Sequence, residues 1–252
     1  MTLYGPSSVA GGSGEDGAVP AVFLDKVLFC WPGREQPVLD IPSFTVRAGE
    51  HVFIAGPSGS GKSTLLGLIA GILSPSVGTV AVNGVRLNDL GGAERDIFRG
   101  DHIGFIFQQF NLIPYLSVLE NVLIPCAFSP LRRMRAVRQG GSPLQAAQAL
   151  LERLDMSSTL LNRKANRLSV GQQQRAAAAR ALIGSPSILI ADEPTSSLDA
   201  DRREIFLQLL LRECGETCST LLFVSHDLNL ADNFPVTVFL PELNRAAEEN
   251  GQ

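Results

Sequence analysis

The spacing of apolar residues predicts that the first half of the chain is mainly β-sheet. Short runs enriched in Val, Ile and Phe alternate with segments rich in Gly, Pro and polar residues, which is typical of strands. Asn83 and Gly84 directly follow one run, and this pair is a strong signal for a tight turn. The predicted strands are at residues 22–29, 44–47, 52–55, 79–82 and 103–107.

Between about residues 112 and 185 the spacing of apolar residues becomes helical, and from there strands and helices alternate. Strands that alternate with helices favour a parallel sheet. The pattern predicts an α/β fold with a mainly parallel core sheet and an inserted helical subdomain at about 112–185. The predicted elements are helices at 144–154, 172–183 and 201–212 and strands at 187–191, 220–224 and 236–240.

The two ends of the chain differ in composition from the rest. Residues 1–20 are rich in Gly, Ser and Pro and have no apolar periodicity. They bury too little surface to offset the entropy of ordering, so we expect a flexible N-terminal tail. Residues 241–252 are expected to form a polar C-terminal tail. One domain is therefore predicted over residues 21–240.

Composition and charge narrow the classes of function. The chain has 252 residues, of which 45% are hydrophobic, and this suffices for one large α/β domain. Its formal net charge of −4 gives no general basic field, so no nucleic acid is expected as a partner. The longest apolar stretch, at 64–73, is much shorter than the ~20 residues that cross a bilayer. The first twenty residues do not resemble a secretory signal, so a cytoplasmic location is expected.

One segment, at 131–141, is strongly basic. Its spacing predicts a solvated helix face followed by a loop, and a contact with lipid headgroups is the alternative. The basic residues of this segment are Arg132, Arg133, Arg135 and Arg138.

A glycine-rich segment after the third predicted strand fits the pattern G-x-x-x-x-G-K-[ST] of phosphate-binding loops. In such loops backbone N–H groups and the N-terminus of the next helix surround the phosphates. Lys62 is predicted to reach the β- and γ-phosphates and the Ser63 hydroxyl to bind Mg²⁺. The pattern alone leaves kinases, GTPases and motor ATPases open, and a plain connecting loop is the alternative. The predicted nucleotide-binding residues are Gly56, Pro57, Ser58, Gly59, Ser60, Gly61, Lys62, Ser63 and Thr64.

Two acidic residues follow the apolar strand at 187–191. The carboxyl ends of parallel strands face the ligand, so both acids are expected in the site. Asp192 is predicted to hold Mg²⁺, and Glu193 to accept a proton from the water that attacks the γ-phosphate. An acidic turn at a strand end is the alternative interpretation.

Residues 168–175, Leu-Ser-Val-Gly-Gln-Gln-Gln-Arg, resemble the signature motif of ABC ATPases. The remaining motifs of that family follow in its order. Gln108 is similar to the Q-loop residue, 196–199 to the D-loop and 225–227 to the switch-histidine loop. The resemblance extends over residues 22–230.

This resemblance implies a P-loop NTPase fold with an added antiparallel β-subdomain, with ATP and Mg²⁺ as cofactors, and hydrolysis of ATP. It also implies that Gln108 contacts Mg²⁺ and the attacking water, and that His226 donates to the γ-phosphate. A homodimer is implied in the ATP-bound state. In it Ser169 and the N–H groups near Gly171 meet the γ-phosphate held by the other subunit. The same resemblance assigns Gln172 and Asp199 to the nucleotide site.

Residues 104–114 are similar to the lipoprotein-release, macrolide-export and cell-division branch of the family. This implies a separate transmembrane permease as partner, a peripheral position on the inner face of the cell membrane, and export or lipid and lipoprotein extrusion. A regulatory ATPase that controls a membrane partner without transport is the alternative. A soluble ABC ATPase that acts on DNA or ribosomes fits less well, because such proteins usually carry two cassettes or long coiled coils.

Three features leave alternatives open. Trp31 is expected to stack on adenine, with Phe29 as the competing aromatic. Val170 stands where relatives usually have a second glycine, so either this position is helical or the anion site is distorted. The apolar run at 110–116 lies where the resemblance places the groove for a short helix of the membrane subunit, and core packing is the alternative.

Overall fold

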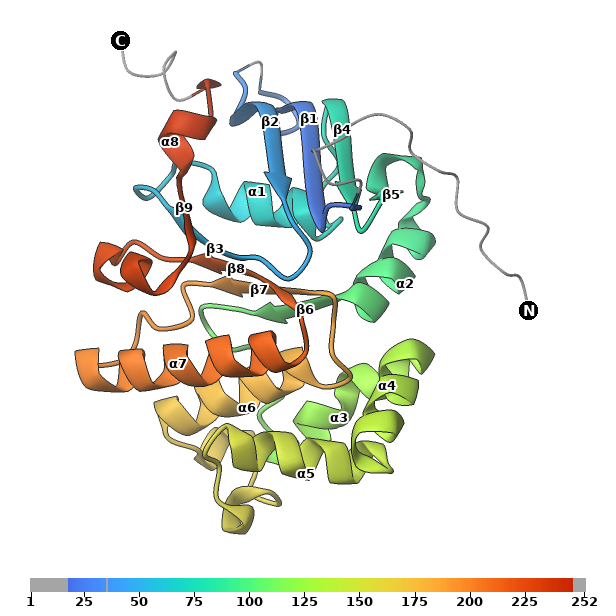
Figure 1. Ribbon diagram of the computed structural model, residues 1–252, viewed down its shortest axis with the longest axis vertical. Coiled ribbons are helices and arrows are strands. Elements are labelled where there is room, and N and C mark those ends of the chain that lie inside the picture. The colour runs from blue at the N-terminus through green and yellow to red at the C-terminus, as the bar shows by residue number, and fades with distance from the viewer. Residues whose placement is uncertain (1–17, 35, 247–252) are drawn as a thin grey trace.

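The computed structural model describes residues 18–34 and 36–246, which form two sheets and a group of helices (Figure 1). The antiparallel sheet lies at the top of the view, the parallel sheet crosses the middle, and most helices lie below it. The α/β class and the insertion of helices between strands are confirmed. Residues 1–17 of the predicted N-terminal tail and residues 247–252 of the C-terminal tail lie outside the described part of the chain.

The first sheet is antiparallel and four-stranded. Its first strand alternates more and less buried positions, in agreement with a sheet that has one face on the core. Asn83 and Gly84 have φ values of 50° and 77°, and they close the predicted tight turn. In spatial order the strands are β2 (Leu39–Val46), β1 (Val22–Phe29), β4 (Val77–Val82) and β5 (Val85–Arg86).

The second sheet is five-stranded and parallel. Its two central apolar runs are buried along nearly their whole length, because helices or the other sheet cover both faces. In spatial order the strands are β6 (Ile103–Ile106), β7 (Ile188–Asp192), β8 (Thr220–Val224), β3 (His51–Ala55) and β9 (Val236–Phe239).

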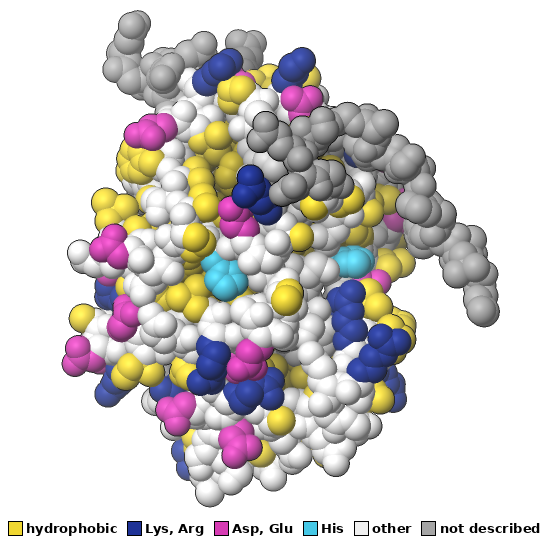
Figure 2. All heavy atoms as spheres, in the orientation of Figure 1, with side chains coloured by type: hydrophobic (Ala, Val, Ile, Leu, Met, Phe, Trp, Pro, Cys, Tyr) yellow, Lys and Arg dark blue, Asp and Glu magenta, His cyan; other side chains and the backbone are white. Residues whose placement is uncertain are grey.

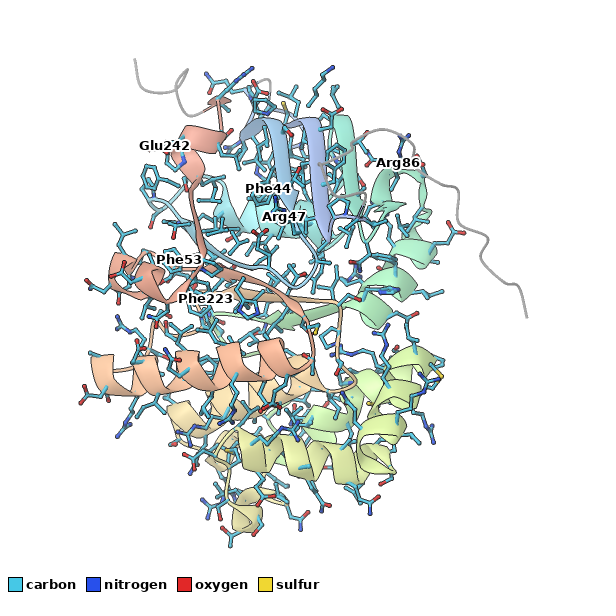
Figure 3. All side chains as sticks on the ribbon, viewed as in Figure 1. Phe44, Arg47, Phe53, Arg86, Phe223 and Glu242 are labelled. Carbon is cyan, nitrogen blue, oxygen red and sulfur yellow. The ribbon has the colours of Figure 1, made fainter. Side chains whose placement is uncertain are left out.

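Stacked phenylalanines lock together two strands of the parallel sheet. Phe53 of β3 and Phe223 of β8, both labelled in Figure 3, are fully buried, and their ring centroids lie 6.0 Å apart. Phe234 packs against both rings, and its ring centroid lies 5.4 Å from that of Phe53 and 5.3 Å from that of Phe223. Aromatic pairs at these separations stabilise the folded protein by more than the burial of their surface alone. The packing therefore fixes the relative position of the two strand ends beyond these residues.

Helix α1 (Lys62–Ile69) lies between the two sheets (Figure 1). Six of its eight residues are buried, which explains why this segment is apolar on all sides. Of the other helices, α3 to α7 form a layer below the parallel sheet, α2 leads into β6, and α8 lies above the parallel sheet beside β2 (Figure 1). They are α2 (Gly92–His102), α3 (Val118–Phe128), α4 (Pro130–Gly140), α5 (Pro143–Arg153), α6 (Val170–Leu182), α7 (Ala200–Glu216) and the short α8 (Leu240–Leu243).

Serine residues begin all four helices of the inserted subdomain. In each case the serine hydroxyl accepts a hydrogen bond from the backbone N–H three residues later, at distances of 3.0 to 3.4 Å. Such a cap satisfies one of the free N–H groups of the first turn and contributes about 1 kcal/mol. The capping residues are Ser117, Ser129, Ser142 and Ser169.

The expectation that the basic segment is a solvated helix face is wrong for Arg132. This residue of α4 is only 3% exposed. Its guanidinium donates to the backbone oxygens of Ala181 and Ile183, where α6 ends, and the distance from Nε to the Ile183 oxygen is 2.9 Å. Burial lowers the pKa of Arg132 to about 10. A cation at a helix C-terminus satisfies carbonyl groups that have no partner within the helix.

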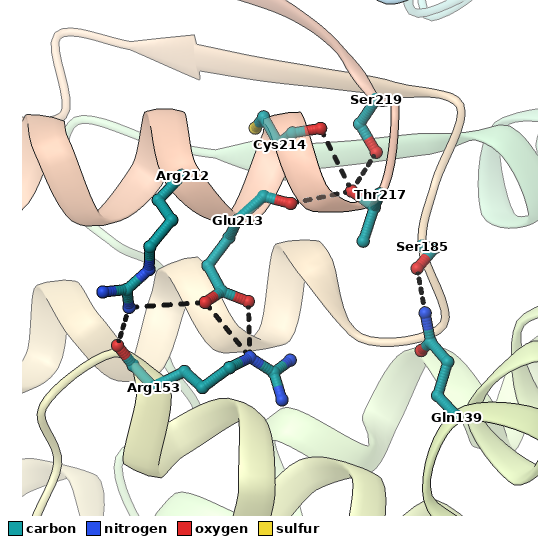
Figure 4. Close-up of polar contacts among 8 residues, drawn as sticks. All are labelled: Gln139, Arg153, Ser185, Arg212, Glu213, Cys214, Thr217 and Ser219. Atoms are coloured by element: carbon teal, nitrogen blue, oxygen red, sulfur yellow. Dashed lines mark hydrogen bonds and ion pairs between the residues drawn. The ribbon is translucent and has the colours of Figure 1, made fainter.

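An ion pair between a half-exposed arginine and a buried glutamate connects the inserted helices to the core (Figure 4). Nε of Arg153, at the end of α5, lies 2.9 and 3.1 Å from the two carboxylate oxygens of Glu213 in α7. The Glu213 side chain is buried, and Arg212 approaches the same carboxylate at 3.5 Å. The same junction contains Gln139, whose amide donates to the Ser185 hydroxyl at 2.6 Å.

The packed chain continues beyond the domain boundary expected at residue 240. Asn244 is buried, accepts a hydrogen bond from the Asp40 N–H at 2.8 Å and donates to the Val38 oxygen at 2.9 Å. Ala246 is buried as well. Within the predicted polar C-terminal tail, Asn244 and Ala246 are therefore packed, and Asn244 is bonded to β2.

Candidate nucleotide-binding and catalytic site

The topology of the parallel sheet gathers four predicted motifs at one edge. The segments that follow β6, β7, β8 and β3 all begin at the carboxyl ends of parallel strands. They contribute Gln108, Asp192, His226 and the phosphate loop that precedes α1. Ligands of open parallel sheets bind at this edge. The sheet therefore brings together residues that are up to 170 positions apart in the sequence.

The phosphate loop has the backbone conformation that its glycines permit. Gly59 and Gly61 have φ values of 84° and 97°, a region that other residues rarely adopt. A Cβ on Gly61 would also lie 2.7 Å from the side chain of Leu39. Lys62 folds back over the loop, and its Nζ donates to the backbone oxygens of Gly56 and Pro57 at 2.7 and 2.8 Å. The lysine ammonium is therefore held at the centre of the loop.

Two oxygen-bearing side chains that could bind a metal meet at the start of α1. The Ser63 hydroxyl donates to a carboxylate oxygen of Asp192 at 3.4 Å. Burial and the charge of the adjacent Glu193 raise the pKa of Asp192, while Ser63 and Lys62 act in the opposite direction. A hydroxyl and a carboxylate are donors that suit Mg²⁺, which prefers oxygen ligands. The donor set therefore fits the predicted metal.

Glu193 and His226 contact each other across the strand ends. Nδ1 of His226 lies 2.6 Å from a carboxylate oxygen of Glu193. Glu193 has a left-handed backbone with φ of 49°, and its N–H donates to the Val224 oxygen at 3.0 Å. This unusual backbone aims the side chain toward the next strand. The imidazole of His226 remains exposed.

The signature segment lies on the other subdomain. Ser169 caps α6, and the Gln172 side chain accepts from the Ser169 N–H at 3.0 Å. Val170 is the first helical residue, so the helical alternative is the correct one for this position. A Cβ on Gly171 would meet nothing within 4 Å. The first turn of α6 is therefore open to approach from outside.

The signature segment and the phosphate loop of one chain lie apart. In Figure 1, α1 is above the parallel sheet and α6 is below it. The two helices belong to different hydrophobic clusters, one on each side of the sheet. Asp199 caps α7 and accepts from the Arg202 N–H at 3.0 Å. The structure thus does not join Ser169 to the phosphate loop within the chain.

The aromatic candidates differ clearly in exposure. Phe29 is only 5% exposed and is part of the core around β1, whereas Trp31 is 40% exposed. Their ring centroids lie 5.0 Å apart, nearly perpendicular to each other. Trp31 is thus the one of the two with a ring available to a ligand.

The apolar run at 110–116 is divided between core and surface. Phe110 is buried, as the core alternative predicts. Leu112 packs partly against the core, whereas Tyr115 is strongly exposed. The predicted docking surface is therefore restricted to the residues near Tyr115.

Three polar residues that connect the motifs were not predicted from the sequence. Gln174 is buried in α6, and its amide donates to the Pro194 oxygen at 2.6 Å, directly after Glu193. Arg180 donates to the backbone oxygens of Phe110 and Asn111, both at 2.6 Å. Arg203 pairs with the carboxylate of Asp227 and donates to the Leu198 oxygen. Gln174 shares a helix face with buried alanines, and this polar residue on an apolar stripe was the available signal.

A strand, a phosphate loop and a helix, followed by an acidic residue at the end of a neighbouring parallel strand, define a P-loop NTPase. The comparisons make the class more specific. A family model described as ABC transporter matches residues 39–196. The chain belongs to this family and carries its ATP-binding domain.

Individual relatives agree with this assignment. The chain is 43% identical over 189 residues to the uncharacterized ABC transporter ATP-binding protein MJ0796 of Methanocaldococcus jannaschii, which covers 75% of this chain and 79% of that protein. It is 36% identical over 199 residues to the lipoprotein-releasing system ATP-binding protein LolD of Saccharophagus degradans, covering 79% and 84%. A dimeric structure of MJ0796 in a post-hydrolysis state, bound to ADP and Pi, has a TM-score of 0.74 at 36% identity and covers 90% and 95%. The branch indicated by residues 104–114 is thereby confirmed.

Proposed function

We propose that this chain binds ATP with Mg²⁺, hydrolyses it at the interface of a homodimer, and thereby drives a separate membrane-spanning partner. The observation that carries the proposal is the contact of 2.6 Å between Glu193 and His226 beside the phosphate loop. It pairs a proton acceptor with a group that can donate to an anion, at the edge where a triphosphate would lie.

Lys62 and the loop backbone account for phosphate binding. In the structure the ammonium of Lys62 is bound by two carbonyl oxygens of its own loop. The β- and γ-phosphates replace these neutral acceptors with charged ones, and charge-assisted hydrogen bonds are roughly twice as strong. The N-terminus of α1, with the hydroxyl-bearing Ser63 and Thr64 in its first turn, faces the same anion.

The metal is assigned to the oxygen donors at the start of α1. Ser63 and Asp192 would hold Mg²⁺, and Gln108, which follows β6, would reach it from the neighbouring strand end. When bound, Mg²⁺ neutralises negative charge on the phosphate oxygens. The remaining steps depend on side chains of the protein.

Glu193 and His226 divide the chemistry of hydrolysis. A carboxylate oxygen of Glu193 accepts the proton of the water that attacks the γ-phosphate. His226 donates to an oxygen of the same phosphate and so helps to stabilise the charge that develops there. Gln174 supports this arrangement by holding the oxygen of Pro194, the residue next to Glu193.

The dimer follows from the separation of the two anion-binding segments. Ser169, Gly171 and Gln172 form an open helix start on the opposite side of the sheet from α1. A second copy of the chain, placed head to tail, brings this helix start and Asp199 to the γ-phosphate on the other subunit. The dimeric structures of MJ0796 support this arrangement. Trp31 would cover the adenine.

The membrane partner would dock near Tyr115. This exposed aromatic lies in the loop that follows Gln108, and Arg180 ties the same loop to the signature helix. A change in the state of the γ-phosphate therefore has a short path to the docking surface. By this contact the protein would be held at the inner face of the cell membrane. The lipoprotein-releasing relative LolD supports extrusion of lipids or lipoproteins as the transported class.

Hydrolysis and dimerisation are tested together in two variants. Glu193→Gln keeps the size of the side chain but removes the base, so hydrolysis should fall by roughly 10² or more while ATP binding persists. Sedimentation of this variant with ATP should show dimers. Adding Ser169→Arg should abolish them and leave the affinity of the monomer for ATP unchanged. Dimers in the double variant, or wild-type turnover in Glu193→Gln, contradict the proposed site.

Docking is tested by Tyr115→Asp, with Ile72→Asp as the matched control at another exposed apolar residue. The Tyr115 variant should fold and bind ATP but no longer copurify with its membrane partner, whereas the control should copurify. Circular dichroism and nucleotide titration establish folding. If the folded Tyr115 variant retains the partner, the docking surface lies elsewhere.

A further inference from the structure

Helix α4 has an exposed face that combines apolar and cationic side chains. The opposite face of the helix is buried and contains Arg132 and Ala136. On the exposed face, Pro130, Met134 and Val137 are spaced by four and three residues, so they form one stripe along the helix. Met134 is 45% exposed and Val137 is 42% exposed.

Two exposed arginines flank this stripe. At 100° per residue, Arg133 lies on one side of it and Arg138 on the other. We call Pro130, Arg133, Met134, Val137 and Arg138 the α4 ridge. Phe128, which is 83% exposed, precedes the ridge at the end of α3. A large exposed phenylalanine next to an apolar stripe is a feature that solvent alone does not favour.

The segment of the chain that carries the ridge has only positive charges. Residues 121–151 contain four arginines and no Asp or Glu, although the whole chain has a net charge of −4. Two of these arginines are used within the protein, because Arg132 is buried and Arg135 donates to the Ser185 oxygen at 3.0 Å. Arg133 and Arg138 are therefore the pair presented to a partner. Figure 2 shows dark blue and yellow side chains together over the region that α4 occupies in Figure 1.

The ridge is also rigidly mounted. Arg132 fastens the buried side of α4 to the end of α6, and Ser129 caps the helix and bonds to Asp101 of α2. Gly184 packs so closely that a Cβ there would lie 2.4 Å from the Arg132 oxygen. The exposed side chains consequently project from a fixed helix.

We propose that the α4 ridge binds an anionic phospholipid surface. An apolar stripe with arginines on both sides is the pattern of helices that lie in the membrane interface, where the apolar tips enter and the cations meet headgroup phosphates. Side chains that project from a single helix can enter a flat, deformable lipid surface, whereas recognition of a partner helix uses a groove. This contact does not depend on nucleotide, so its failure would leave the proposed ATPase function untouched.

The expected effect is moderate, because only two arginines contribute. A basic residue near an anionic surface adds roughly fivefold to binding, so the pair should give about 25-fold preference for anionic over neutral vesicles at low salt. The preference should decrease as salt is added, since screening shortens the range of the attraction. Such binding would orient the protein at the membrane and add to the affinity for a membrane partner.

Cosedimentation of the full chain with vesicles tests the proposal. The vesicles are phosphatidylcholine alone or phosphatidylcholine with 30% phosphatidylglycerol, chosen as probes of surface charge. The test variant is Arg133→Gln with Arg138→Gln. The control is Arg47→Gln with Arg86→Gln, which removes the same charge from exposed positions near the antiparallel sheet (Figure 3).

The ridge variant should lose most of the preference for anionic vesicles, and the control should keep it. Met134→Gln with Val137→Gln should reduce binding to anionic vesicles about threefold, while circular dichroism stays unchanged. Equal binding of the wild type to both vesicles overturns the proposal, as does equal binding of the ridge variant and the control. A ridge variant that binds vesicles normally but loses a membrane partner also overturns it, and assigns the ridge to protein contact.

Discussion

Lys62 and Arg132 each donate to two backbone carbonyl oxygens, but they lie in regions of opposite character. Lys62 lies at the edge of the parallel sheet where we propose that the nucleotide binds. It is partly exposed, and its partners are only five and six residues away in the same loop. Arg132 is in the junction of the inserted helices, and its partners are 49 and 51 residues away. A lysine ammonium is a point charge on a flexible stem, whereas the planar guanidinium matches two fixed acceptors. The first arrangement can exchange its partners and the second cannot.

The carboxylates repeat this difference. The carboxylate of Glu193, at the sheet edge proposed to bind the nucleotide, contacts the exposed His226, while that of Glu213 in the junction is buried and bonded by Arg153 through both oxygens. Residues proposed for chemistry thus keep partners that a ligand can replace. Residues that hold the two subdomains together are saturated by partners within the protein. This contrast indicates which charged residues affect stability and which affect activity.

The largest effect on stability is expected for Arg153→Met. This change leaves the buried Glu213 carboxylate with only the longer contact to Arg212, and removing the partner of a buried charged group costs about 3 kcal/mol. Urea unfolding measures the loss. Adding Glu213→Leu should recover most of it, because the buried carboxylate without a partner is then replaced by an apolar side chain. If the double variant is as unstable as the single one, the ion pair is not the cause.

Lys62→Ala should reduce the affinity for ATP and leave the stability of the protein nearly unchanged, in contrast to Arg153→Met. The affinity for ATP should fall by about 10², since the cation nearest the phosphates is lost, while the free energy of unfolding should change little. Nucleotide titration and urea unfolding measure the two effects. Lys164→Ala is the control at an exposed lysine. Unchanged affinity in the Lys62 variant contradicts the assignment of the phosphate loop.

Arg132→Gln should destabilise the protein by about 2 kcal/mol, because the oxygens at the end of α6 lose charged donors and stay buried. The affinity of the folded protein for ATP should stay within a factor of two. Thermal unfolding and nucleotide titration provide the comparison. A large loss of affinity without a loss of stability would show that Arg132 acts on the site.

The smallest expected effect concerns pH. The raised pKa of Asp192 means that this carboxylate takes up a proton at a higher pH than an ordinary aspartate. Mg²⁺ requires the ionised form, so metal-dependent affinity for ATP should decrease as the pH falls through that raised pKa, by at most about tenfold per pH unit. Titrations with and without Mg²⁺ measure this dependence. The Asp192→Asn variant should bind ATP weakly in the presence of Mg²⁺. Its affinity for ATP should no longer show the pH dependence that requires the metal.

The sequence determined the local features of this protein. The strand at Thr220–Val224 and the turn at Asn83 follow from runs of a few neighbouring residues, and the structure agrees with both. The phosphate loop could be predicted for the same reason, because glycines, lysine and serine act within one turn of chain. Val170 remained ambiguous, since its backbone depends on where α6 begins, and the cap by Ser169 settles this point.

The tertiary structure decided which charges are buried. Arg132 and Arg133 are neighbours in one basic segment, yet only the first lies against the end of α6. The partners of Arg132, Arg153 and Gln174 are 20 to 60 residues distant and belong to other elements. Spacing along the chain contains little information about such contacts, because they depend on how the helices pack against each other. Periodicity therefore predicted the elements and the motifs, while the saturated junction and the exposed ridge on α4 became visible only in the folded chain.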